Sequence, residues 1–365
     1  MAKIDQFLRL LVQHGGSDLH LSCGSPPVLR IDGGLERVAC RDLAPRDLKT
    51  LVAEILSEEQ SRRLEESGDL DFGYEVPGLA RFRGNCFRQQ HGPAAVFRAI
   101  ASRVPTADEL QVPETIRAFT GLRNGLVLVT GPTGSGKSST LASLIDLINQ
   151  TRAEHILTIE DPIEFVHRGK CALINQREVG RHTNSFAAAL KAALREDPDV
   201  ILLGEMRDRE TISLALTAAE TGHLVFGTLH TNSAHKTIDR IIDTFPGDLQ
   251  EQVRAMLAET LRGVVCQQLL RKKGGKGRVA AHEILVANPA VANLIREGKT
   301  FQLPSLMQTG KRDGMVQMDQ CILDLLAAGM IDGDEARSRS QDRAAVDRFL
   351  ANQRPLSREL ANIRV

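Results

Sequence analysis

The sequence contains no tryptophan and a single tyrosine, Tyr74, so aromatic residues make up only 4% of the 365 residues. Proteins that bind single-stranded nucleic acid usually stack the bases on aromatic rings, and here phenylalanine would have to supply them. The formal charges also cancel, with 46 Lys and Arg against 46 Asp and Glu. Because no net charge draws the chain toward nucleic acid or anionic lipid, we expect no nucleic-acid partner, and DNA pumping is disfavoured.

The chain also lacks paired cysteines and long apolar runs. Its six cysteines are far apart and include no C-x-x-C pair, which argues against a four-cysteine zinc site or a dithiol redox motif. The N-terminus has no signal-peptide core, and no run approaches 18 apolar residues. We therefore expect a cytoplasmic protein without direct membrane insertion, which reaches a membrane only through a partner.

A glycine-rich turn between an apolar strand and a helix is the most informative stretch of the sequence. It matches the phosphate-binding pattern G-x-x-x-x-G-K-[ST] at every specified position. Its glycines let successive N–H groups converge on phosphate oxygens, and the helix that follows adds a partial positive charge. The candidate residues for binding ATP and Mg²⁺ are Gly131, Pro132, Thr133, Gly134, Ser135, Gly136, Lys137, Ser138 and Ser139. In this motif, Lys137 reaches the β- and γ-phosphates and the Ser138 hydroxyl holds Mg²⁺.

Two further apolar strands end in carboxylates, at the edge where parallel α/β sheets bind ligands. The first is followed by Glu160 and Glu164, either of which could orient or deprotonate the attacking water. The alternative is an acidic cap for the next segment. The second runs from Asp199 to Gly204 and is followed by Glu205, a candidate metal ligand acting through water. Glu205 could instead only pair with Arg207.

Histidines bracket a third apolar strand, with His223 before it and His230 after it. A straight strand rises about 3.3 Å per residue, so both side chains cannot touch one γ-phosphate. At most one is therefore a phosphate sensor, and His230 lies at the same predicted sheet edge as Glu205. Arginines in the first hundred residues could neutralise charge on a transferring phosphoryl group, although a solvated strand face is the simpler interpretation. The candidates are Arg81, Arg83 and Arg98.

Hydrophobic periodicity predicts the domain organisation. Alternating strands and amphipathic helices in residues 1–101 predict a small α+β domain with an antiparallel sheet. Residues 102–113 contain two prolines and form the predicted linker. Apolar strands that alternate with helices predict a parallel, doubly covered sheet in residues 114–288. Mostly helical patterns follow, including helices over 250–271 and 333–350, and residues 289–365 form a predicted helical C-terminal region.

These motifs together resemble the secretion/traffic ATPase superfamily, and most closely its type IV pilus retraction branch. The resemblance rests on the phosphate loop, the acidic box at 159–167, the Leu194–Asp208 segment and the Ala218–His230 segment, and it extends over about residues 1–335. One motif departs from the retraction family: Ala292 stands where that family has an arginine. Extension and type II secretion ATPases usually carry a tetracysteine insertion and a longer N-terminal region, which this chain lacks, so retraction is favoured.

The resemblance implies a homohexameric Mg-dependent ATPase with a PAS-like N-terminal domain, a RecA-like P-loop NTPase core and a helical C-terminal region. Hydrolysis would move the domains and turn an inner-membrane platform protein, so that the pilus retracts. The resemblance implies Glu164 as the base, although position alone leaves Glu160 open. It also implies Glu205 as the metal-site acid, His223 and His230 as a histidine box, and the three arginines as phosphate contacts.

Other functions stay open at this point. An accessory retraction motor stays possible and could also be a partner of this chain, although the segments 204–208 and 228–231 favour the principal retraction motor. A small-molecule kinase would use the same loop as a monomer, and a scaffold would bind ATP without hydrolysing it.

Overall fold

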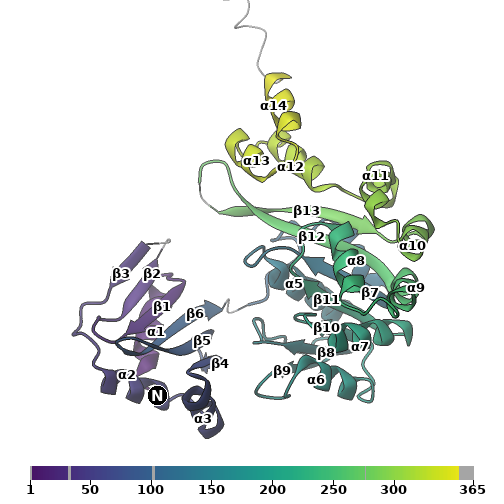
Figure 1. The fold of residues 1–365 in the computed structure, drawn as a ribbon. Coiled ribbons are helices and arrows are strands. Elements are labelled where there is room, and N and C mark those ends of the chain that lie inside the picture. Colours follow the sequence, from purple (N-terminus) through teal and green to yellow (C-terminus); the bar gives the residue numbers. More distant parts are fainter. Residues whose placement is uncertain (1, 32–33, 101–102, 276, 353–365) are drawn as a thin grey trace, which may run out of the picture. The chain divides into compact units, whose positions relative to one another are not determined.

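The structure is a computed structural model that describes residues 2–31, 34–100, 103–275 and 277–352. The chain forms two compact units (Figure 1). Met1–Val104 and Pro162–Val166 make up the first unit, and Pro105–Asp161 and His167–Val365 make up the second. The predicted boundary at 101–102 and the end of the predicted C-terminal region, 353–365, lie outside the described residues.

The first unit is built on a six-stranded antiparallel sheet with the strand order β3-β2-β1-β6-β5-β4. Side chains alternate along its strands, so Phe82 and Cys86 of β5 are buried while Arg83 between them is exposed. Two rings, Phe72 and Phe97, pack edge to face at 6.1 Å in the core. The predicted small α+β domain is thus confirmed, with the elements α1 (Ile4–Gln13), β1 (Asp18–Ser22), β2 (Val28–Ile31), β3 (Gly34–Arg37), α2 (Pro45–Ala53), α3 (Glu58–Ser67), β4 (Asp69–Val76), β5 (Ala80–Gln89) and β6 (Gly92–Ile100).

The second unit is built on a seven-stranded sheet with the order β13-β12-β7-β11-β10-β8-β9. All neighbouring strands are parallel except β12 and β13, which pair antiparallel. Every residue of β7 and β11 is buried, as expected for strands covered on both faces. The strands are β7 (Gly125–Thr130), β8 (His155–Glu160), β9 (Leu173–Glu178), β10 (Val200–Leu203), β11 (Leu224–Leu229), β12 (Leu261–Arg271) and β13 (Arg278–Val286).

Helices cover both faces of this sheet, because alternate residues of β7 enter two different apolar clusters. Leu126 and Leu128 pack with residues of α6 (Phe186–Ala193), α7 (Arg209–Glu220), α8 (Ala234–Asp243) and α9 (Gln250–Thr260). Val127 and Val129 pack with α5 (Lys137–Thr151) and α4 (Glu114–Ala118) on the other face, next to η1 (Phe119–Gly121). This arrangement confirms the predicted parallel, doubly covered sheet.

One predicted helix is wrong. The helix expected over 250–271 ends at Thr260, and residues 261–271 form β12 instead. The run Val264, Val265 and Cys266 is fully buried beside β7, where its backbone completes the sheet. At Gly263, an added Cβ would lie 2.3 Å from the ring of Phe119. The strand therefore packs closer to this ring than any residue with a side chain would allow. Sheet pairing thus overrides the helical spacing of the segment.

The C-terminal part of the second unit is helical, as predicted. It comprises α10 (Pro289–Arg296), η2 (Thr300–Gln302), α11 (Leu303–Thr309), η3 (Gly310–Asp313), α12 (Met318–Ala327), α13 (Gly333–Arg339) and α14 (Arg343–Asn352). The single helix predicted over 333–350 is wrong, because the helix is interrupted at Ser340, between α13 and α14. There the Asp319 carboxylate accepts hydrogen bonds from the Ser340 hydroxyl and from the next two backbone N–H groups. Within the described residues, no helix has both the length and the apolar character needed to span a bilayer.

Candidate active site

The phosphate loop lies between β7 and α5, and its glycines have the backbone conformations that the motif requires. Gly131, Gly134 and Gly136 have φ angles of 141°, 78° and 87°, a region that only glycine adopts easily. The nine residues predicted to bind nucleotide thus form this loop and the start of α5. Pro132, Thr133, Gly134 and Ser138 are exposed, so one side of this turn is open.

Lys137 is the first residue of α5 and is buried, with 9% of its surface exposed. Its Nζ donates to the carbonyl oxygens of Gly131 at 2.8 Å and Pro132 at 3.1 Å. The ammonium thus lies over the loop itself, where a bound phosphate would add a stronger acceptor.

Glu205 lies two residues after the end of β10, and its carboxylate contacts two side chains. Its Oε1 lies 3.0 Å from Nε2 of His230 and also contacts Nε of Arg207. The hydrogen bond to Glu205 raises the pKa of Arg207. Because His230 follows β11 and these two parallel strands are neighbours, their carboxyl ends bring acid and histidine together. The predicted proximity of Glu205 and His230 is a feature of this structure.

Gly204 explains how the ends of β8 and β10 approach each other. A Cβ added at Gly204 would lie 3.2 Å from both Cα of Glu160 and the carbonyl oxygen of Ile159. Glu160 therefore lies at the same sheet edge as Glu205. One of its oxygens, Oε1, accepts hydrogen bonds from the Thr158 hydroxyl at 2.6 Å and from Nε2 of Gln176 at 3.1 Å.

Glu164 lies in a different compact unit from Glu160. It is half-buried in the segment Pro162–Val166, which groups with the N-terminal unit. Its role as the base stays a prediction.

His223 lies at the opposite end of β11 from His230. Its Nδ1 is 2.9 Å from the carbonyl oxygen of Ala218, at the end of α7. Seven residue steps separate the two histidines, or about 23 Å along an extended strand. They are therefore not brought together, and the predicted role of His223 in nucleotide binding stays a prediction.

The three candidate arginines belong to the sheet of the first unit. Nε of Arg98 donates to the buried carboxylate of Asp18 at 2.8 Å. Burial by itself would raise the pKa of Asp18, but hydrogen bonds from Ser17 and Arg98 outweigh it and lower the pKa. Arg83 lies 3.8 Å from the exposed carboxylate of Asp71, and Arg81 is its neighbour on the same strand. Arg98 and Arg83 thus have partners in their own sheet, and the predicted phosphate contacts of all three arginines are untested.

A cavity of about 510 Å³ opens beside Glu205 and His230. Two arginines line it, Arg207 and Arg240, so the space beside the acid–histidine pair is cationic. Sequence reasoning missed Arg240. The only available signal was its place in α8, six residues after the helix begins and therefore about 9 Å along its axis.

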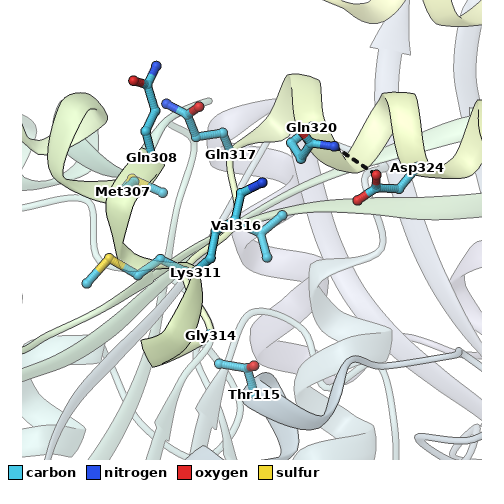
Figure 2. Close-up of a pocket in the computed structure, with 10 residues that line it drawn as sticks. Thr115, Met307, Gln308, Lys311, Gly314, Val316, Gln317, Gln320 and Asp324 are labelled. Atoms are coloured by element: carbon cyan, nitrogen blue, oxygen red, sulfur yellow. Dashed lines mark hydrogen bonds between the residues drawn. The ribbon is translucent and has the colours of Figure 1, made fainter.

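A second cavity, of about 590 Å³, lies in the C-terminal helical part of the second unit (Figure 2). Side chains of η3, α11 and α12 line it, and Figure 2 shows Gln320 bonded to Asp324, an N–O distance of 2.8 Å. It contains none of the predicted site residues. We therefore place the candidate active site at the edge of the sheet.

Mg²⁺ needs hard oxygen ligands and usually binds through one or two protein groups, several waters and substrate phosphates. In the described parts of the chain, no cluster of three His, Cys, Asp or Glu side chains could hold a metal by itself. The exposed hydroxyl of Ser138 and the carboxylate of Glu205 are oxygen donors of the right kind. The residues present thus fit an ion that also binds the phosphates of the nucleotide.

Known proteins resemble this chain over most of its length. The family model for the Type II/IV secretion system protein matches residues 2–335. The type IV pilus retraction ATPase PilT of Pseudomonas aeruginosa is 53% identical over 338 residues, which cover 93% of this chain and 98% of that protein. A twitching motility protein of Neisseria gonorrhoeae is 54% identical over 316 residues, covering 87% of this chain and 84% of its own length.

The fold has a similar counterpart among solved structures. The crystal structure of the pilus retraction motor PilT with bound ADP superposes with a TM-score of 0.88 at 48% identity, covering 95% of this chain and all of that one. This similarity confirms the RecA-like fold class, with its smaller N-terminal domain. By the extent of the family match and the identity of these relatives, the chain belongs to the Type II/IV secretion system protein family.

Proposed function

We propose that this protein is an ATP-hydrolysing motor that drives the retraction of type IV pili. The observation that carries the proposal is the edge of the parallel sheet. There a complete phosphate loop follows β7, Glu205 follows β10 and His230 follows β11. The identity to a pilus retraction ATPase over nearly the whole chain supports the cellular role.

The residues divide the chemistry as follows. Loop N–H groups and Lys137 bind the phosphates of ATP, and the helix dipole of α5 adds positive charge at the same point. A bound Mg²⁺ would neutralise charge on the β- and γ-phosphates, held by the Ser138 hydroxyl and, through water, by Glu205. His230, whose Nε2 lies 3.0 Å from Oε1 of Glu205, keeps that carboxylate oriented. Glu164, with Glu160 as the alternative, orients the attacking water.

The motor is proposed to act as a homohexamer at the inner face of the cytoplasmic membrane. There it would bind a platform protein of the pilus machine, which converts nucleotide-driven domain motion into pilin removal. A second retraction ATPase is a further candidate partner. The names of the relatives, which place those proteins in pilus retraction and twitching motility, support only the association with a pilus machine.

Two experiments test this function. Purified protein should release phosphate from ATP only with Mg²⁺, and Lys137→Ala should abolish the release; a Lys137→Ala variant with unchanged turnover would refute the enzymatic role. Deletion in the host should leave piliated cells that cannot retract their pili. Cells without pili would instead indicate extension, and cells with normal twitching but reduced force would indicate an accessory motor.

A further inference from the structure

Gln267 lies beside the phosphate loop on a strand that the motif does not include. It belongs to β12, which pairs in parallel with β7, and Cys266 is the register partner of Thr130. Gln267 is thus one residue past the last pair, at the level where the loop begins at Gly131. Its side chain is buried, with 2% exposed.

The amide of Gln267 makes two hydrogen bonds, one to the phosphate loop and one to the first turn of α5. Its Nε2 donates to the carbonyl oxygen of Ser135 at 2.7 Å, and its Oε1 accepts from the Thr140 hydroxyl at 2.8 Å. Ser135 and Thr140 are themselves buried, with 3% and 2% exposed. Because a carbonyl oxygen can only accept, a flipped amide would set oxygen against oxygen, and the orientation of the side chain is thereby fixed.

Gln267 also lies against Gly131 and Gly136, the glycines at the two ends of the loop. A Cβ added at Gly131 would lie 2.3 Å from the backbone oxygen of Gln267, and one at Gly136 would lie 2.9 Å from its Nε2. These glycines are therefore needed for the close approach of Gln267 as well as for their positive φ angles.

The bond to Ser135 determines the direction of a neighbouring N–H group. In a planar trans peptide, the C=O of one residue and the N–H of the next point in opposite directions. Since the Ser135 carbonyl points at Gln267 on β12, the Gly136 N–H points away from β12. Convergent N–H groups on the open side of such a loop are what bind phosphate oxygens.

Lys137 and Gln267 divide the loop carbonyls between them. The Lys137 ammonium donates to the carbonyl oxygens of Gly131 and Pro132, at the start of the loop. Gln267 donates to the carbonyl oxygen of Ser135, near its end. Without the Gln267 amide, the buried carbonyl of Ser135 would lose this hydrogen-bond donor. If the Ser135–Gly136 peptide rotated to reach a different donor, the Gly136 N–H would turn away from phosphate.

We propose that Gln267 is a positioning residue for nucleotide binding, which holds the Ser135–Gly136 peptide in the orientation that binds phosphate. This inference rests on the proposed ATPase function. Part of the affinity for nucleotide then depends on β12, a strand that lies outside the phosphate-loop motif.

Binding of a fluorescent ADP analogue to the full-length protein with Mg²⁺ tests the proposal. Gln267→Leu removes both hydrogen bonds and should raise the Kd about tenfold or more. Gln267→Glu keeps the acceptor for Thr140 but opposes the Ser135 carbonyl, and should weaken binding at least as much. Thr140→Val removes only the second bond and should raise the Kd less than threefold.

Gln268→Leu is the matched control, because the next residue of the strand points to the other face of the sheet. It should leave the Kd within twofold. A merely structural role would lower the melting temperature of the Gln267 variants without changing their Kd, and that result would overturn the proposal. If Gln267→Leu does not fold, the isosteric Gln267→Glu decides on the same criterion. Absence of ADP binding in the unmodified protein would instead refute the proposed function itself.

Discussion

The two sheets of this protein place their charged residues differently. In the antiparallel sheet of the first unit, charged side chains alternate with buried ones along the strands, as Arg83 does beside Phe82. In the parallel sheet of the second unit, β7 and β11 bury every residue, and Glu205 and His230 come only after the strands end. One sheet has a polar face, whereas the other has a polar edge.

This difference determines how far a charged residue can be interpreted from sequence. A charge along an antiparallel strand has partners within its own sheet, as Arg98 has in Asp18. A charge just past a buried parallel strand has no such face to occupy, and several such ends meet at one edge. Functional predictions at strand ends are therefore the more secure of the two kinds.

The largest expected effect concerns the two candidate bases, which lie in different units. Glu164→Gln should lower kcat about 1000-fold, the middle of the range for removing a general base. Glu160→Gln should lower it less than tenfold, because two hydrogen bonds already hold one oxygen of that carboxylate. Phosphate release at saturating ATP measures both. The opposite ranking would assign the base to Glu160 and to the edge of the parallel sheet.

The next effect tests the edge itself. Glu205→Gln should lower kcat about 100-fold and leave ADP binding within a few fold, because it removes the negative charge proposed to act at the metal. Arg207→Gln is the matched control, since Arg207 shares the same carboxylate. If Arg207→Gln reproduced the whole loss, Glu205 would serve only as an ion-pair partner.

A smaller effect separates two arginines of the antiparallel sheet. Arg98→Gln should destabilise the protein by about 1–2 kcal/mol, because Asp18 is buried and loses a charged hydrogen bond. Arg83→Gln should cost less than about 0.5 kcal/mol, since its pair with Asp71 is exposed and 3.8 Å long. Urea unfolding measures both. The resemblance to retraction ATPases adds a separate expectation, that both variants hydrolyse ATP more slowly, and unchanged turnover would leave these arginines a structural role only.

The smallest effect is a pH dependence at β13, the edge strand of the parallel sheet. Burial lowers the pKa of His282 from 6.5 to about 4. Between about pH 6.5 and 4, the unfolded chain binds a proton at this histidine that the folded chain does not bind. The free energy of unfolding is therefore unaffected by His282 above about pH 6.5 and decreases as the pH falls toward 4. Between pH 7.5 and 5.0, His282→Gln should reduce the fall in melting temperature by about 3 °C. The exposed His14 provides the control: His14→Gln should show the same fall as the unmodified protein.

Much of the fold follows from local patterns. Period-two alternation predicted the antiparallel sheet, and continuous apolar runs predicted β7, β8, β10 and β11. The same reasoning failed at residues 261–271, whose apolar spacing also suits a helix. It gave no expectation for β9, an edge strand with exposed positions. In both places, pairing with a neighbouring strand decides the structure, and a local pattern carries no information about that neighbour.

The sequence by itself determined the phosphate loop, because its glycines, lysine and hydroxyl act within eight consecutive residues. It also determined which strands end in carboxylate or histidine. Only the tertiary structure decided that Glu205 and His230 meet, since that depends on β10 and β11 being neighbours. The same holds for Gln267, which is 132 positions away from the Ser135 carbonyl that it binds. Strand order joins such distant residues, and it depends on how the whole sheet is buried.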